Sequence, residues 1–229
     1  MSSSKPLMLL LGAGANIGEA VAKKFASSGF NVATAARSLD NSHVSPGRWT
    51  YKIDLNKPED VTNLFTKVSS EVGIPNVVIY NAAALAFPPD GHPLSVPVAD
   101  IEGSLKINTI SMYAAAQQAI AGFEKLPKSI LKTFLYTGNM LNTTSMPMLI
   151  SLGIGKSASA HIIQSAALAY SDKDYQFYYV DERKEDGSPM GTAVNGHAHA
   201  EHFFNLAGQE KQGPWDSTFV EGKGYVKFD

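Results

Sequence analysis

The sequence predicts an α/β fold: a single domain, residues 1–229, with a doubly wound parallel sheet of about seven strands and helices on both faces. Two observations carry this prediction. Strand-like and helix-like segments alternate along the whole chain, and this order requires right-handed crossovers between parallel strands. The first strand-like segment, Leu7–Leu11, is apolar at every position, as expected for a strand covered on both faces.

The first half of the chain supplies four of these strands and two helices. The helix expected at Ile17–Ser28 repeats apolar residues at helical spacing and is closed by Gly29. Pro58–Val72 places apolar side chains along one side, as in an amphipathic helix. The strands are short runs of apolar or β-branched residues and span Leu7–Leu11, Asn31–Ala35, Trp49–Ile53 and Asn76–Tyr80.

The second half continues the alternation. A long helix is expected over Val98–Phe123, a helix rich in small residues over Leu149–Tyr170, and a last helix over Gly196–Gln209. Strands are expected at Leu131–Tyr136, Tyr175–Val180 and Thr218–Phe228. Ligands bind outside the carboxyl ends of such strands, so three irregular, mostly apolar loops are expected to line a crevice there: Leu85–Pro97, Asn139–Leu149 and Asp181–Asn195.

Composition excludes several classes of function. The 19 Lys and Arg residues nearly balance the 21 Asp and Glu residues, which argues against nucleic acid or an anionic membrane as the main partner. Without cysteine the chain has no disulfide, thiol nucleophile or cysteine-ligated metal. The apolar runs are too short to span a bilayer, and no basic segment precedes the first of them. A cytoplasmic protein is therefore expected.

A glycine-rich turn follows the first strand and opens the first helix. Glycine lets such a turn tighten and lets its backbone approach a pyrophosphate, while the helix N-terminus adds unpaired N–H groups and a positive dipole end. In this position the turn indicates a dinucleotide site of the Rossmann type. The residues expected to contact the cofactor here are Gly12, Gly14, Ala15, Asn16, Ile17 and Gly18.

The end of the second strand indicates which dinucleotide binds. Sites for NAD usually carry an acidic residue there, whereas this chain has Arg37 and Ser38. A guanidinium pairs with a 2′-phosphate and a carboxylate repels it. We therefore expect NADP(H) to be preferred over NAD(H). Asp40 is the lower-ranked alternative, as an acid placed in a displaced loop.

Five features, ordered from Leu7 to Val180, resemble the short-chain dehydrogenase/reductase family. Beyond the glycine turn they comprise an acidic residue after the third strand, an Asn-Ala pair after the fourth, a helix asparagine and a helix lysine. The resemblance implies that Lys156 holds the nicotinamide ribose and that the other matched residues contribute to cofactor binding or catalysis. These residues are Asp54, Leu55, Asn81, Ala82, Ala83 and Asn108.

The chain departs from the family pattern in its proton-transfer residues. The family's tyrosine lies four residues before the lysine, where this chain has Leu152. The family's serine would fall at Gly138 or Asn139, and Asp181-Glu182 replace the usual Pro-Gly. The expected catalytic residues are therefore Asn108, Asn139 and Lys156, with Asn139 as a neutral donor to a carbonyl oxygen.

These features predict an NADP(H)-dependent oxidoreductase acting on a small, moderately hydrophobic carbonyl or alcohol substrate. Two alternatives remain open: a lyase, isomerase or cyclase on the same scaffold, and a non-catalytic NADP(H)-binding protein. Family members commonly pair through their long helices, so a homodimer or homotetramer is expected.

Other titratable residues receive structural interpretations from the sequence. Tyr178 and Tyr179 are expected to pack in the sheet, and Asp181 and Glu182 to lie in a solvated loop. His161 is expected in the core or at a subunit interface. The histidine-rich run 197–202 is expected to form a polar helix over the substrate, and no metal site is expected.

Overall fold

A computed structural model describes residues 5–228 of the chain. Its sheet has the strand order β3-β4-β2-β1-β5-β6-β7-β8-β9. The first strand, β1, lies between β2 and β5, and the chain order reverses there. The strands span Leu7–Leu11 (β1), Asn31–Ala36 (β2), Ser42–Ser45 (β3), Arg48–Lys52 (β4), Val77–Tyr80 (β5), Lys132–Thr137 (β6), Tyr175–Glu182 (β7), Asp216–Val220 (β8) and Gly224–Tyr225 (β9).

The seven strands from β4 to β8 in this order run parallel, which confirms the predicted doubly wound sheet. Two antiparallel strands, β3 and β9, extend its edges. Strand β3 was not predicted, and the single strand predicted at Thr218–Phe228 is divided into β8 and β9. The β3 segment is short, polar and exposed, and β9 has only two residues. The β3 segment does not carry the apolar pattern from which a strand is recognised in sequence.

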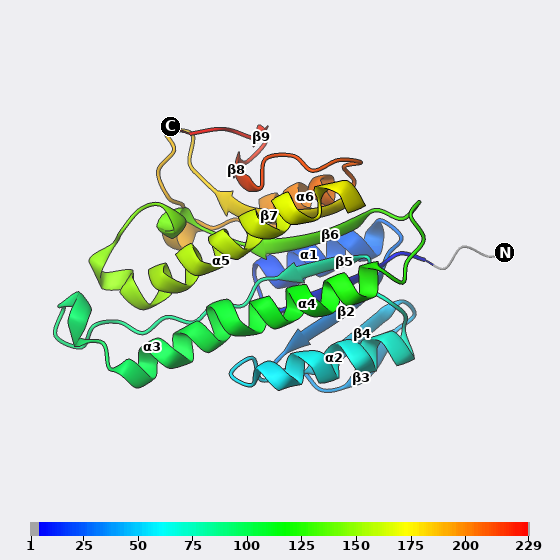
Figure 1. The fold of residues 1–229 in the computed structure, drawn as a ribbon, viewed down its shortest axis with the longest axis horizontal. Helices are drawn as coiled ribbons and strands as arrows, with labels where there is room; N and C mark the ends of the chain where they lie inside the picture. Colours follow the sequence, from blue (N-terminus) through cyan, green and yellow to red (C-terminus); the bar gives the residue numbers. More distant parts are fainter. Residues whose placement is uncertain (1–4, 229) are drawn as a thin grey trace.

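Helices cover both faces of the sheet (Figure 1). One core cluster lies between the sheet and α2, α4 and α5, and the other between the sheet and α1 and α6. No helix within residues 5–228 combines the length and apolarity needed to cross a membrane. The α-helices span Ile17–Ser27 (α1), Pro58–Glu71 (α2), Val98–Leu105 (α3), Ser111–Phe123 (α4), Ile150–Ala169 (α5) and Gly196–Ala207 (α6).

The predicted long helix Val98–Phe123 is continuous but contains a π-helical turn, η2, at Lys106–Ile110. Asn108 lies in this turn and is fully buried. Its side chain accepts a hydrogen bond from the Ala84 N–H and donates one to the Ala84 carbonyl, both at 2.8 Å. A π-turn widens the helix by one residue and often marks a functional position. Here it accompanies an asparagine that holds the loop after β5.

Candidate active site

The glycine turn between β1 and α1 is shaped by two glycines that have no room for a side chain. Gly12 has a φ of +88°, and a Cβ there would lie 2.4 Å from the backbone nitrogen of Ala82. A Cβ on Gly18 would lie 2.8 Å from the backbone of Ala13. Gly14 is different, because nothing lies within 4 Å of the place its Cβ would take. Its backbone is therefore open to a ligand.

Asn16 ties this turn to the segment before α6. Its Nδ2 donates to the Val194 carbonyl at 2.8 Å, and its Oδ1 accepts from the Gly196 N–H at 3.1 Å. A Cβ on Gly196 would lie 2.5 Å from the Asn16 Oδ1. The asparagine that replaces the family's middle glycine therefore has a structural partner far away in sequence.

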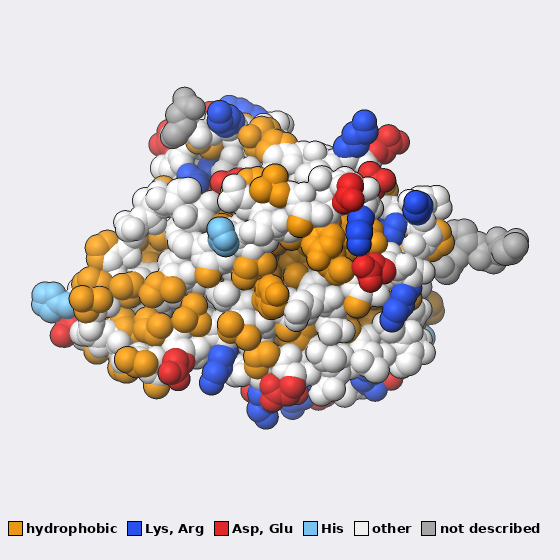
Figure 2. All heavy atoms as spheres, viewed as in Figure 1, with side chains coloured by type: hydrophobic (Ala, Val, Ile, Leu, Met, Phe, Trp, Pro, Cys, Tyr) orange, Lys and Arg blue, Asp and Glu red, His pale blue; other side chains and the backbone are white. Residues whose placement is uncertain are grey.

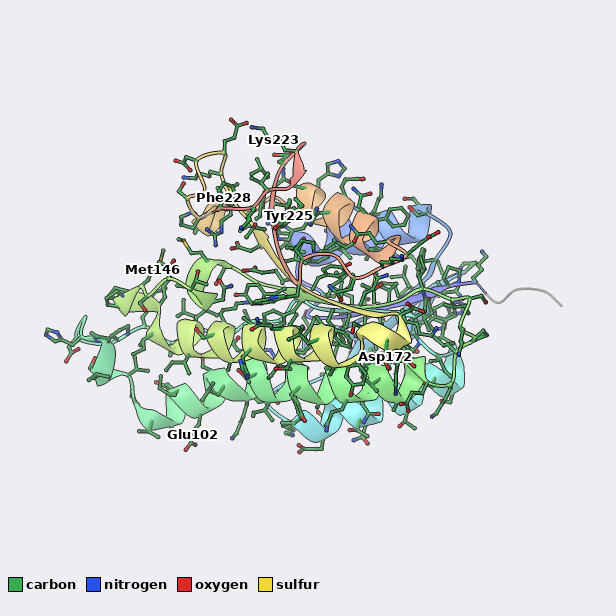
Figure 3. All side chains as sticks on the ribbon, turned by 45° about the horizontal axis from the view of Figure 1, so that its top comes forward. Glu102, Met146, Asp172, Lys223, Tyr225 and Phe228 are labelled. Carbon is green, nitrogen blue, oxygen red and sulfur yellow. The ribbon has the colours of Figure 1, made fainter. Side chains whose placement is uncertain are left out.

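A cavity of ≈ 510 Å³ lies beside the turn, at the carboxyl ends of the strands. Its wall is mostly apolar, and two of the three predicted crevice segments, Asn139–Leu149 and Asp181–Asn195, contribute to it, whereas no residue of Leu85–Pro97 lines it. Figure 3 shows one of these residues, Met146, in the loop that leads into α5. The predicted site residues and family-motif positions on this wall are Gly14, Ala15, Asn16, Ile17, Asn81, Ala83, Asn139, Leu152 and Lys156.

A second cavity of ≈ 420 Å³ adjoins the first through Gly14, Asn81 and Ala83, which line both. Arg37 and Ser38 lie on its wall and are exposed. Within residues 5–228 the Arg37 guanidinium has neither an ion pair nor a hydrogen bond. The remaining predicted cofactor residues on this wall are Gly12, Leu55 and Ala82.

Three predicted site residues line neither cavity. Gly18 packs against the turn. Asp54 accepts a hydrogen bond from the Asn56 N–H at 3.0 Å. Asn108 is buried against Ala84, and its own carbonyl accepts from the Ser159 hydroxyl at 2.8 Å. The structure thus places Asn108 behind the wall, where it positions the loop after β5.

Lys156 lines the first cavity and is only 3% exposed. Its Nζ donates to the Thr137 carbonyl at 2.6 Å and lies 4.5 Å from the centre of the Tyr136 ring. Burial lowers the pKa of Lys156 to about 7, because the charged form loses its hydration. The Asp181 carboxylate opposes this shift. Lys156 can therefore gain or lose a proton near neutral pH.

A chain of hydrogen bonds links Lys156 to the glycine turn. The Thr137 hydroxyl donates to the Asn81 Oδ1 at 2.8 Å, and the Asn81 Nδ2 donates to the Gly12 carbonyl at 2.9 Å. Because Lys156 bonds the Thr137 carbonyl, the end of β6 connects both ends of the site. Asn81 is thus held in place by hydrogen bonds to the end of β6 and to the glycine turn.

In the segment after β6, the ring of Tyr179 leaves no room for a side chain at position 138. A Cβ there would lie 2.1 Å from the Tyr179 ring. The Tyr179 hydroxyl donates to the Asn139 carbonyl at 2.7 Å and accepts from the Asn139 N–H at 3.1 Å. The Asn139 Oδ1 accepts from the Leu141 N–H at 3.1 Å. Tyr179 therefore occupies the space that a serine at 138 would need, and Tyr178 and Tyr179 are buried in the sheet as predicted.

Asp181 and Glu182 do not lie in a solvated loop, and that expectation was wrong. Strand β7 continues through Glu182, and the two residues are 2% and 4% exposed. Asp181 pairs with Arg183, whose Nη1 donates to the Gly187 carbonyl at 2.9 Å. Burial raises the pKa of Asp181 to about 6, and Arg183 opposes this shift. Both acidic residues line the first cavity.

The histidine-rich helix α6 is also different from the expected polar cover. His199 and His202 are buried, and only His197 is exposed. The His202 Nε2 lies 2.9 Å from the Ser217 hydroxyl, and its ring stacks on Phe219. Burial lowers the pKa of His202 to about 4. His199 is the one that reaches the first cavity, where it faces Glu182.

Sequence comparison identifies the family. A family model described as enoyl-(acyl carrier protein) reductase matches residues 12–182. A protein named short-chain dehydrogenase/reductase dmxR12, from Cryptosporiopsis sp. (strain 8999), is 41% identical over 236 residues, covering 98% of this chain and 96% of the relative. The chain belongs to the short-chain dehydrogenase/reductase family. The protein is accordingly an oxidoreductase.

Solved structures share the fold of this short-chain dehydrogenase/reductase. A 3-ketoacyl-(acyl-carrier-protein) reductase from Brucella melitensis, complexed with NADH, is 17% identical with a TM-score of 0.78, covering 96% of this chain and 99% of that one. A double mutant of a Serratia marcescens short-chain dehydrogenase/reductase is 16% identical with a TM-score of 0.77, covering 95% and 96%. ElxO with NADP bound is 17% identical with a TM-score of 0.79, covering 95% and 97%.

Proposed function

We propose that this short-chain dehydrogenase/reductase is an NADP(H)-dependent enzyme that reduces a small, moderately hydrophobic carbonyl compound or oxidises the corresponding alcohol. The observation that carries this proposal is the pair of adjoining cavities, with Arg37 in one and Lys156 in the other. The open backbone at Gly14, which both cavities share, suits the pyrophosphate of a dinucleotide.

The choice of NADP(H) rests on Arg37 and Ser38. Their side chains are exposed on the wall of the second cavity, where a 2′-phosphate would gain a charge-assisted contact. Asp40 is exposed and lies outside that wall, so it does not support the alternative of an acid holding the ribose. Two of the structural neighbours were solved with NADP or NADH bound, which supports a nicotinamide cofactor.

The chemistry rests on the cavity that holds Lys156. A bound reduced nicotinamide supplies a hydride, and the protein must then hold the carbonyl oxygen and provide a proton. Asn139 lies on this wall and can donate a hydrogen bond to that oxygen. Leu152 occupies the position of the family's acid and has no proton to give. We infer an altered catalytic set in which another group supplies the proton.

The cofactor proposal is tested by titrating NADPH and NADH into the wild type and into Arg37→Ala. NADPH should bind at least tenfold more tightly, and the substitution should weaken NADPH about 10- to 100-fold, because a charge-assisted bond contributes about 1.5–3 kcal/mol. NADH affinity should stay within about twofold. Lys52→Ala is the matched control, an exposed cation at the end of β4 outside the cavity. Equal affinities for the two nucleotides would contradict the preference.

Turnover is tested by following NADPH oxidation with a panel of apolar aldehydes and ketones. Lys156→Ala should abolish the activity while retaining the fold, as judged by circular dichroism. Product formed without NADPH consumption would instead favour a lyase, isomerase or cyclase.

A further inference from the structure

A hairpin, residues 183–189, follows β7 and leads into one wall of the first cavity. Pro189 and Met190 line this cavity. Pro189 pairs with Arg183 across the base of the hairpin in an antiparallel bridge, and the Arg183 Nη1 donates to the Gly187 carbonyl at 2.9 Å. The position of the hairpin therefore decides where Pro189 and Met190 lie relative to a bound substrate.

The hairpin buries little of its own surface. Lys184, Glu185 and Asp186 are exposed, and Gly187 has no side chain and a φ of +80°. Segments with few buried apolar contacts open locally at a low cost in free energy. The hairpin therefore depends on contacts from other parts of the chain to stay in place.

Phe228 supplies such a contact from the segment that follows β9. A Cβ on Gly187 would lie 2.7 Å from the Phe228 Cδ1 and 3.2 Å from its Cε1, so the ring lies against the bare backbone of this glycine. Phe228 is half-buried, whereas Tyr225 and Lys227 near it in the chain are exposed. Figure 3 labels Phe228 and Tyr225 on this segment.

The segment that carries Phe228 is itself attached to the sheet. The Val226 N–H donates to the Thr218 carbonyl at 3.0 Å, and the Thr218 hydroxyl donates to the Val226 carbonyl. An ion pair between Lys223 and Glu185, at 3.1 Å, also joins the segment to the hairpin, but exposed pairs contribute little. Phe228 thus follows residues that are bonded to β8 and contacts the hairpin with its ring.

We propose that Phe228 is a positioning residue for the substrate: its ring holds the hairpin in place, and the hairpin presents Pro189 and Met190 to the substrate. This inference rests on the proposed function, because it takes the first cavity as the place where the substrate binds. The far end of the same loop is held separately, since the Asn16 Nδ2 donates to the Val194 carbonyl at 2.8 Å. Loss of the ring should therefore loosen this wall without releasing the glycine turn.

The geometry predicts which kinetic constant responds. Asn139 and Lys156 line the cavity from the segment after β6 and from α5, and neither belongs to the hairpin. A loosened hairpin should thus weaken substrate binding and leave the chemical step intact. Phe228→Ala should raise the KM of a larger apolar ketone about tenfold, with kcat and the affinity for NADPH each within about twofold of the wild type.

Steady-state kinetics with the panel of apolar aldehydes and ketones tests this split, and amide hydrogen exchange followed by mass spectrometry measures the hairpin directly. In Phe228→Ala the amides of residues 184–191 should exchange at least about fivefold faster than in the wild type, and those of residues 216–220 should be unaffected. Phe228→Leu keeps an apolar side chain and should restore most of both readouts. Tyr225→Ala removes an exposed ring from the same segment and is the matched control that should change neither.

A second pair of variants disturbs the same contact from the hairpin side. Gly187→Ala places a methyl group where the Phe228 ring lies, so it should raise both the KM and the exchange of the hairpin amides. Gly222→Ala controls for backbone strain, because Gly222 also has a left-handed backbone, with a φ of +74°, and nothing lies within 4 Å of the place its Cβ would take. Gly222→Ala should leave both readouts unchanged.

The possible outcomes separate this inference from the proposed function. Faster exchange together with a raised KM in Phe228→Ala and in Gly187→Ala would support the positioning role. Unchanged exchange in Phe228→Ala, faster exchange with an unchanged KM, or a loss of kcat without a rise in KM would overturn it and leave the proposed function standing. Absence of NADPH-dependent turnover by the wild type would overturn both.

Discussion

Lys156 occupies a position that penalises its own charge. Its ammonium group has one carbonyl partner and one aromatic face, and the nearby Asp181 carboxylate pairs with Arg183 instead. A folded-state pKa of about 7 lies well below the usual value for lysine, so folding releases a proton between these two values. Active-site residues often carry such a cost in stability.

Replacing Lys156 with Met should therefore stabilise the fold. Burial of the charged lysine lowers the free energy of unfolding by its full amount below pH 7. This cost fades as the pH rises toward 10.5, the pKa of lysine in the unfolded chain. The free energy of unfolding should rise by about 2 kcal/mol at pH 6, once the lost hydrogen bond to Thr137 is subtracted, and by less at pH 9.5. Urea unfolding at both values measures it. The exposed Lys128→Met should show no such pH dependence, and a gain that grows with pH would refute the argument.

Single residues could be placed from the sequence where their position depends on neighbours in the chain. Gly12, Gly14 and Lys156 could be placed from their neighbours in the chain, since a tight turn and a helix position are set locally. Glu182 could not be placed, because its burial depends on His199 and on the backbone of Asn195, which the fold brings to it. Its strand-like continuation from Tyr175 was the only available signal.

At the scale of elements, the contact between the end of β6 and strand β7 limits what the site can hold. Tyr179 points from β7 toward Gly138 and hydrogen-bonds both backbone groups of Asn139. A serine cannot be restored at Gly138 unless this ring moves. The altered catalytic set that we propose would therefore be built into the pairing of two strands.

A double-mutant cycle tests this contact. Gly138→Ala in the wild type should cost about 1–3 kcal/mol, because the new methyl group overlaps the Tyr179 ring. In a Tyr179→Ala background, which is itself destabilised, the same change should cost close to zero. Chemical denaturation provides the four free energies. Equal costs in the two backgrounds would show that the ring is not the obstacle.

Element positions were predictable to within a few residues wherever periodicity is strong, as in α2 and β1. The π-turn at Lys106–Ile110 was not, because it leaves the apolar pattern of the helix intact and arises from the contact of Asn108 with Ala84. The end of β7 was also missed, since charged residues normally end a strand prediction.

At the scale of the whole molecule, one face of the protein exposes apolar side chains. Figure 2, which faces α4 and α5, shows apolar side chains exposed along it. A groove of ≈ 590 Å³ runs between these two helices, and Tyr113 and His161 lie on its wall. Tyr113 is 49% exposed. This is the face through which the predicted homodimer or homotetramer would form.

Ala169→Arg should weaken that assembly. Ala169 lies on the groove wall and is exposed, so a charge there should leave the isolated fold intact and oppose close approach of a second copy. Sedimentation velocity should show a shift toward monomer with an unchanged thermal midpoint. Ser27→Arg, an exposed position on α1 at the opposite sheet face, is the control. A monomeric wild type would contradict the predicted oligomer.

Asn16 has a practical consequence for anyone who wishes to redesign this enzyme. Asn16 hydrogen-bonds the backbone of Val194 and Gly196, so one side chain holds both the glycine turn and the segment before α6. A library that varies Asn16 to change the nucleotide preference will also remove the hydrogen bonds that hold the segment before α6. Selectivity screens on such variants should score both reactants at once.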